Sequence, residues 1–157
     1  MIKLKINNAL FIIAFNRDSN FHNPSDQTAY LDLKSGDIFW VYDSDHDAEM
    51  DGFSAEDNRR NQALLASRPK DFINIDGLSH DVHHDIIKDF LASSWTDDKE
   101  QHSSAMGVYY GRNSIGYWVK NVEDDEAITG YHRFKDERIH ELGLEFLKQH
   151  EIEPEWF

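Results

Sequence analysis

The chain of 157 residues has no cysteine and only three prolines. The absence of cysteine excludes disulfide bonds, thiolate nucleophiles and every zinc site that uses cysteine ligands. Such a chain suits a reducing compartment, so we expect a cytoplasmic location. Long apolar runs are also missing, because the run at residues 9–15 falls far short of the ~20 residues of a membrane-spanning helix. We expect no contact with membranes and interpret residues 9–15 as a buried first element, either a helix capped by Asn7 or Asn8 or a strand.

Basic residues are scarce as well. The chain has 16 Lys and Arg against 30 Asp and Glu, which gives a formal net charge of −14. Nucleic-acid affinity comes largely from Lys and Arg that displace counterions from phosphates, so direct binding to nucleic acid is disfavoured. A surface of this charge is instead attracted to basic proteins. The length and a hydrophobic content of 39% suit one domain over residues 1–157.

Residues 28–42 have the pattern of a β-hairpin. Two β-prone runs, residues 28–32 and 38–42, flank a short polar segment that contains Gly36. Glycine takes the positive φ angle that many tight turns need, so the pattern predicts a turn at this position. Residues 72–75 predict a third strand, and the Asn, Ser, Asp and Pro content of residues 18–27 predicts a loop before the hairpin.

Two segments have clear helical periodicity, residues 79–93 and 135–150. Together with the hairpin they predict an α+β fold, in which a small antiparallel sheet (28–42) packs against two or more long helices. Residues 55–68 predict a peripheral helix or an ordered loop. Pro154 prevents continuation of the last helix, so we expect the chain to end in a tail whose aromatic rings fold back on the domain.

Two polar segments predict surface insertions, an acidic loop at residues 43–58 and a polar loop at residues 93–104. Residues 106–110 then predict a short extended piece. The acidic loop partly matches a calcium-binding pattern that starts at Asp47, but Asn58 stands where the bidentate glutamate belongs. A solvated acidic loop is therefore the favoured interpretation.

The helix at residues 79–93 contains a cluster of histidines and aspartates between His80 and Asp85. His80 and His84 are one helical turn apart, the spacing of two ligands to one metal ion. Helical geometry places His83 among the apolar positions, however, and the sequence identifies no third ligand. Histidines packed at the border of a helix are the favoured interpretation, and we expect no cofactor and no tight binding of calcium or zinc.

Three hypotheses for the function follow. A hydrolase or transferase would use the cluster between His80 and Asp85, although no Ser, His and Asp arrangement is recognisable. A small-ligand sensor would line a pocket with aromatic residues, although aromatic residues at strand and helix positions are usually core. The aromatic candidates are Trp40, Trp95, Tyr109, Tyr110 and Trp118.

The favoured hypothesis is a non-enzymatic interaction module whose acidic surface binds a basic protein. Its sharpest form is a nucleic-acid mimic that inhibits a nucleic-acid-binding protein, which requires acids on one face of the molecule. The candidate partner-binding residues are the acids of two dense segments: Asp43, Asp45, Asp47, Glu49, Asp51, Glu123, Asp124, Asp125 and Glu126.

Several short segments also carry a resemblance to known proteins. The resemblance depends on certain segments and on their order along the chain. They are the hairpin residues 30–38, the helix residues 86–91, the segment 131–139, and the later residues 145–147 and Ile152. In this order they resemble one bacterial family of small, acidic, uncharacterised proteins. The resemblance extends from about residue 9 to residue 153 and implies no activity, because none is assigned to the family.

Overall fold

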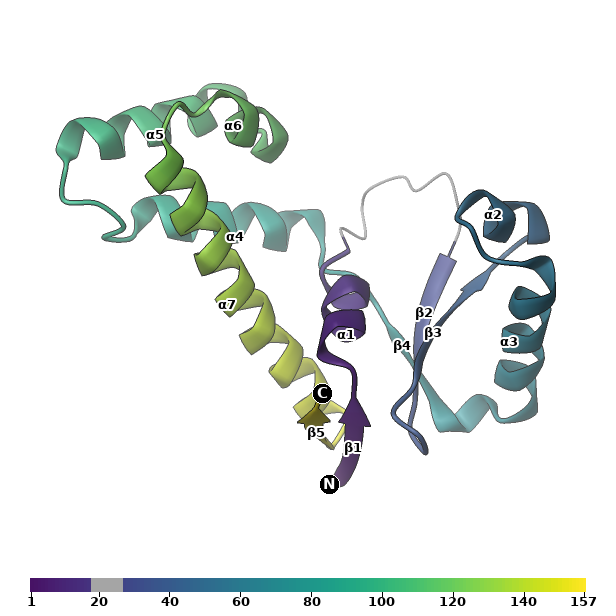
Figure 1. Cartoon of the computed structure of the whole chain (residues 1–157). Helices are drawn as coiled ribbons and strands as arrows, with labels where there is room; N and C mark the ends of the chain where they lie inside the picture. Colours follow the sequence, from purple (N-terminus) through teal and green to yellow (C-terminus); the bar gives the residue numbers. More distant parts are fainter. Residues whose placement is uncertain (18–26) are drawn as a thin grey trace. The chain divides into compact units, whose positions relative to one another are not determined.

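A computed structural model describes residues 1–17 and 27–157 (Figure 1). The fold is α+β, as the sequence predicted, with helices and a small three-stranded antiparallel sheet. The described residues separate into two compact units, residues 1–78 with 142–157, and residues 79–141. The predicted loop at residues 18–27 lies outside the described residues except for Gln27, and the assignment of one domain to the whole chain stays a prediction.

The first unit contains the predicted hairpin and its third strand. Strands β2 (Gln27–Asp32), β3 (Ile38–Tyr42) and β4 (Phe72–Ile75) form an antiparallel sheet in the order β3-β2-β4. Leu31 lies opposite Ile38 on one side and Ile73 on the other, and its side chain is fully buried. The hairpin turn contains Gly36 at a φ of 81°. The sequence-based prediction of the sheet is therefore confirmed.

The acidic segment 43–58 lies at the surface, but the prediction that it is a loop is wrong. Helix α2 (Asp45–Met50) and the start of helix α3 (Ala55–Ser67) occupy most of it. The hydroxyl groups of Ser44 and Ser54 cap the two helices, and acidic residues in each first turn favour the helix dipole. These local signals outweigh the repulsion within the acidic run.

Helix α3 lies beside the sheet and is held to β3 by hydrogen bonds (Figure 1). The Asn58 side chain is buried, accepts a hydrogen bond from the Tyr42 backbone N–H at 2.9 Å and donates one to the Tyr42 carbonyl. A short 3-10 helix, η1 (Pro69–Asp71), then leads into β4. The predicted packing of the helices at 79–93 and 135–150 against the sheet involves both units and stays a prediction.

The chain ends form a second, parallel pair of strands that the sequence did not predict. Strand β1 (Ile2–Ile6) pairs with β5 (Ile152–Trp156), and Leu4 lies opposite Pro154. The tail expected after residue 150 is thus a strand. Ile2 N–H bonds to the Glu151 carbonyl and Phe157 N–H to the Ile6 carbonyl. Only every second residue of β5 forms hydrogen bonds with β1, and Pro154 is not one of them. Its position would direct an N–H away from β1, so the proline costs no hydrogen bond in this pair of strands.

Helix α1 (Asn8–Phe15) confirms the interpretation of residues 9–15 as a helix. The Asn7 side chain caps it by accepting the Leu10 N–H at 3.0 Å. Phe11 and Phe15 stack at 5.5 Å between ring centroids, and Phe11 also lies 5.5 Å from Trp156 and 6.4 Å from Phe146. This aromatic cluster packs α1 against the C-terminal segment of the first unit.

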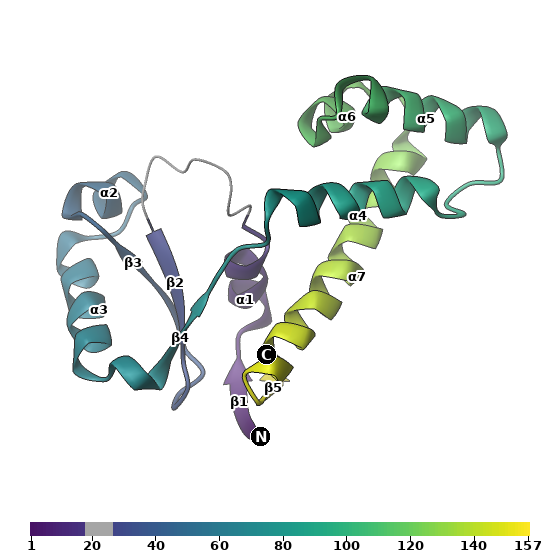
Figure 2. The ribbon, with the colours of Figure 1, turned by 180° about the vertical axis from the view of Figure 1, so that it is seen from behind.

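The second unit is helical (Figure 2). It contains α4 (His80–Ala92), α5 (Lys99–Arg112), α6 (Ile115–Asn121) and the first part of α7 (Asp125–Gln149). The helix predicted at residues 79–93 is confirmed as α4. The predicted polar loop at 93–104 is wrong from Lys99 onward, and the predicted extended piece at 106–110 is wrong, because both lie in α5. This helix begins at Lys99 because the Asp98 side chain accepts the Glu100 and Gln101 N–H groups.

Helix α7 is longer than the predicted helix at residues 135–150. It begins ten residues earlier, at Asp125, directly after Asp124, whose side chain accepts the Ala127 N–H at 3.1 Å. The extra turns bury Ala127 and Tyr131. None of the helices among the described residues is long and apolar enough to span a membrane.

Candidate functional site

Helix α2 and the turn after it form an acidic surface with two exposed apolar side chains, which we call the α2 surface. Its members are Asp43, Asp47, Glu49, Met50, Asp51 and Phe53. Met50 is 64% exposed and Phe53 is 44% exposed. Ala48, on the opposite side of α2, is fully buried and anchors the helix. The acids were predicted from the sequence, but the two apolar residues were missed, although their position inside an acidic run was a visible signal.

The acids of α2 differ in their partners. Asp45 is paired with Arg59, whose Nη2 lies 2.6 Å from its Oδ2, so Asp45 is neutralised locally. Asp51 accepts a hydrogen bond from the Tyr42 hydroxyl, and burial together with this carboxylate raises the pKa of Tyr42. Within residues 1–17 and 27–157, Asp43, Asp47 and Glu49 form no ion pair. Asp43 and Asp47 carry charge that no described cation pairs with. Asp45 contributes most to raising the pKa of Arg59, and Glu49 adds to this from beyond direct ion-pair contact.

The second acidic segment belongs to the second unit and has partly structural roles. Asp124 caps α7, and Glu126 accepts a hydrogen bond from the Gln101 side chain at 3.0 Å, which ties α7 to α5. Glu123 and Asp125 are exposed. Because the two acidic segments lie in different units, their gathering on one face stays a prediction.

The partial calcium-binding pattern does not form a calcium loop. Asp47 and Glu49 lie in helix α2, and the Asn58 side chain is committed to the backbone of Tyr42. The described residues hold no group of three or more His, Cys, Asp or Glu side chains that fits a metal ion.

The histidines of α4 are placed as the sequence indicated, at the border of the helix. His83 and His84 are buried, whereas His80 is half-buried. The two Nε2 atoms of His80 and His84 lie 2.9 Å apart. Nδ1 of His84 is hydrogen-bonded to the hydroxyl of Tyr109, a residue of α5 that is fully buried. Burial, followed by the charges of Tyr110 and Asp85, raises the pKa of Tyr109, so its hydroxyl stays neutral.

The aromatic residues proposed for a sensor pocket belong to both units, and within the second unit Tyr109 and Tyr110 are in ring contact at 5.1 Å between centroids. Trp40 lies in the sheet of the first unit, and the other four lie in the second unit. Trp118 and Tyr109 are fully buried in the core, and the Trp118 Nε1–H donates to the Ala105 carbonyl at 3.0 Å. Tyr110 is 53% exposed. The buried members are core residues, as expected for aromatic side chains at helix positions.

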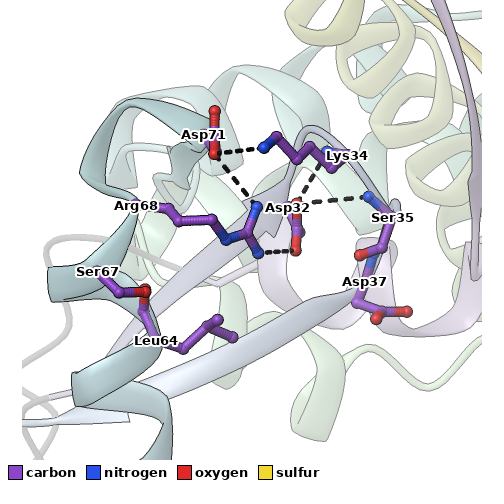
Figure 3. A network of polar contacts seen from close by, with 8 residues as sticks. All are labelled: Asp32, Lys34, Ser35, Asp37, Leu64, Ser67, Arg68 and Asp71. Carbon is purple, nitrogen blue, oxygen red and sulfur yellow. Dashed lines mark hydrogen bonds and ion pairs between the residues drawn. The ribbon is translucent and has the colours of Figure 1, made fainter.

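A network of polar contacts joins the hairpin turn to the segment between α3 and β4 (Figure 3). Asp32 is almost fully buried, and its carboxylate accepts the Lys34 N–H at 2.8 Å and the Arg68 guanidinium at 2.9 Å. Arg68 and Lys34 both lie 3.3 Å from the Asp71 carboxylate. Lys34 lies in the hairpin turn, and Arg68 and Asp71 join this turn to the segment before β4, so this cluster has a structural role.

The Asp32 carboxylate provides a testable titration. Burial opposes its ionisation, but hydrogen bonds from Lys34 and Arg68 outweigh burial and lower the pKa below the usual 3.8. A lowered carboxyl pKa stabilises the fold above about pH 3.8, and this contribution is lost as the pH falls through the lowered value. We expect Arg68→Gln to raise the pKa of Asp32, measured by carboxyl ¹³C NMR titration. The control Arg60→Gln, at an exposed arginine of α3, should leave that pKa unchanged, and equal values in both variants would contradict the assignment.

Comparison with known proteins gives one informative relative. The chain is 25% identical over 126 residues to a UPF0158 protein of Pseudomonas aeruginosa, and the aligned region covers 80% of this chain and 74% of the relative. No family model matches the chain, and no solved structure matches it. The expected resemblance is confirmed: the chain is similar to a protein of an uncharacterised bacterial family.

Proposed function

We propose that the protein is an interaction module that binds a basic partner protein through the α2 surface. The observation that supports this is the combination of three carboxylates that form no ion pair with a described residue, Asp43, Asp47 and Glu49, with the exposed apolar side chains of Met50 and Phe53. A solvated acidic segment needs no exposed apolar residues. A protein-binding surface uses both, because charge steers the encounter and apolar contacts hold the complex.

The α2 surface is also presented rigidly. Ser44 caps the helix, Ala48 anchors it, and the Phe53 ring lies 5.5 Å from the ring of buried Tyr42. A side chain that is already held in place loses less conformational entropy when a partner binds. The partner we infer therefore carries Lys or Arg residues around an apolar side chain.

The nucleic-acid mimic is the sharper version of the same proposal. It requires that the acids at 43–57 and at 123–126 face one partner together, at spacings like those of backbone phosphates. A partner that binds nucleic acid and is displaced by it would support this version. A cytoplasmic location stays a prediction that fits either version.

We expect the variant Asp43→Lys with Glu49→Lys to lose a basic partner that the unaltered protein captures from bacterial lysate at low salt. Both side chains are exposed, and neither forms an ion pair among the described residues, so the fold should be preserved. The captured protein is identified by mass spectrometry, and its affinity is then measured with purified protein across a salt series. Affinity should fall as salt rises, because screening weakens exposed charge interactions.

A matched control is the variant Asp136→Lys with Glu137→Lys, on the exposed side of α7. It changes the net charge by the same amount, from −14 to −10, without touching the α2 surface. Met50→Ser is a second variant, which should weaken binding without changing the salt dependence. Equal loss in both charge variants, or a partner indifferent to salt, would contradict the proposal.

A further inference from the structure

We propose that His80 and His84 form a two-histidine binding site for a divalent transition-metal ion of the class that prefers imidazole, such as Ni²⁺, Cu²⁺ or Zn²⁺. The site is independent of the α2 surface. Both residues lie on α4, four positions apart, and their Nε2 atoms are hydrogen-bonded to each other at 2.9 Å. The sequence showed the spacing, and the structure adds the direct approach of the two nitrogen atoms, between which a metal ion would replace the shared proton.

The separation of the two nitrogen atoms fits a shared ion. Metal–imidazole bonds are about 2.0–2.1 Å long, so two nitrogens bound at a right angle are about 2.9 Å apart. A right angle is the ligand arrangement of tetragonal Cu²⁺ and Ni²⁺ sites. Tetrahedral Zn²⁺ would need the rings to separate by a few tenths of an ångström, which a half-buried side chain such as His80 can accommodate. We therefore expect Ni²⁺ to suit the described separation of the two nitrogen atoms.

Tyr109 would act as a positioning residue for the metal ligand His84. Metal-binding histidines usually donate their second ring N–H to a neighbouring acceptor, which fixes the ring and the tautomer. Nδ1 of His84 is hydrogen-bonded to the Tyr109 hydroxyl, and Tyr109 is fully buried in α5. When Nδ1–H donates to this oxygen, the lone pair of His84 Nε2 accepts the hydrogen bond from His80, and a bound metal ion would take the place of that proton.

The charge around the site favours a cation. His80 is the first residue of α4, and the positive end of a helix dipole disfavours metal ions. Asp81 and Asp85 are exposed on the same helix and offset this effect. Among the described residues the two imidazoles are the protein ligands, and water completes the coordination. With two ligands the affinity should lie in the micromolar range, in keeping with the expectation of no tight zinc site.

The test is a titration of the full chain with NiCl₂. Calorimetry measures the number of ions bound and their affinity, and thermal denaturation measures the melting temperature at each Ni²⁺ concentration. We expect one ion to bind, the melting temperature to rise with Ni²⁺ because the ion binds the folded state, and Mg²⁺ to have no effect. His80→Gln should weaken this binding at least about tenfold, and Tyr109→Phe by about tenfold. The matched control His132→Gln removes an exposed histidine of α7 and should leave the affinity unchanged.

His80 is the first choice for substitution because it is only half-buried, whereas loss of His84 also removes a buried hydrogen bond. Circular dichroism of each variant without metal verifies the fold. The proposal is overturned if Ni²⁺ leaves the melting temperature unchanged, or if His80→Gln and His132→Gln bind Ni²⁺ as well as each other.

Discussion

Phe90→Ala should lower the free energy of unfolding by about 3–5 kcal/mol. The Phe90 side chain is only 2% exposed, and its ring contacts four aromatic rings at centroid distances of 5.4 to 6.4 Å. These rings belong to Trp95, Trp118, Tyr131 and Phe134. The neighbours come from the connection between α4 and α5, from α6 and from α7, and are too large to close around an alanine, so the substitution leaves a cavity. Urea denaturation followed by circular dichroism measures the loss.

Phe53→Ala is the matched control, because it deletes the same ring from a site that is 44% exposed. It should change the free energy of unfolding by no more than about 1 kcal/mol. The loss in the free energy of unfolding for Phe146→Ala should lie between those for Phe90→Ala and Phe53→Ala. The sequence placed Phe146 and Phe90 equally in the core, but Phe146 is half-buried in the structure. A loss below about 1 kcal/mol for Phe90→Ala would show that the core of the second unit is misplaced.

The sequence predicted correctly those elements whose own residues give strong local signals. Helix α4 combines a capping serine, Ser79, with apolar residues on one stripe, and the hairpin combines β-prone runs with Gly36. Helix α5 lacks such a stripe: Ala105 and Tyr109 are its buried residues, so its polar composition indicated a loop. The capping residues Ser44 and Asp98 were visible, but the charge and polarity around them indicated solvated segments.

Non-local pairing accounts for the largest omission. Strand β5 forms only because β1, at the other end of the chain, lies beside it, and no local pattern reports such a partner. Pro154 even indicated that regular structure would end. This indication was wrong, because a missing N–H weakens a strand only where that edge of the strand is paired. In the candidate sites, too, local features could be predicted and contacts between distant residues could not. The acids and the His80 and His84 spacing were visible, but the bond from His84 to Tyr109 joins residues 25 positions apart.

Gly36→Ala should lower the free energy of unfolding by about 3 kcal/mol, from two physical causes. Gly36 has a φ of 81°, a left-handed conformation that costs an L-residue about 1–2 kcal/mol. A Cβ atom at Gly36 would also lie only 2.1 Å from the carbonyl oxygen of Lys5 in β1. This oxygen belongs to backbone that is paired with β5, so it moves only if the strands shift, an overpacking cost of about 1–3 kcal/mol.

Gly52→Ala separates the two causes. Gly52 has nearly the same φ, 85°, but a Cβ atom there meets nothing within 4 Å. It should therefore cost only the left-handed strain, about 1 kcal/mol, and urea denaturation of both variants should differ by about 2 kcal/mol. The difference measures the close approach of the hairpin turn to strand β1. If the two variants are equally destabilised, the turn does not pack on Lys5, because the strain at positive φ alone would then account for both losses.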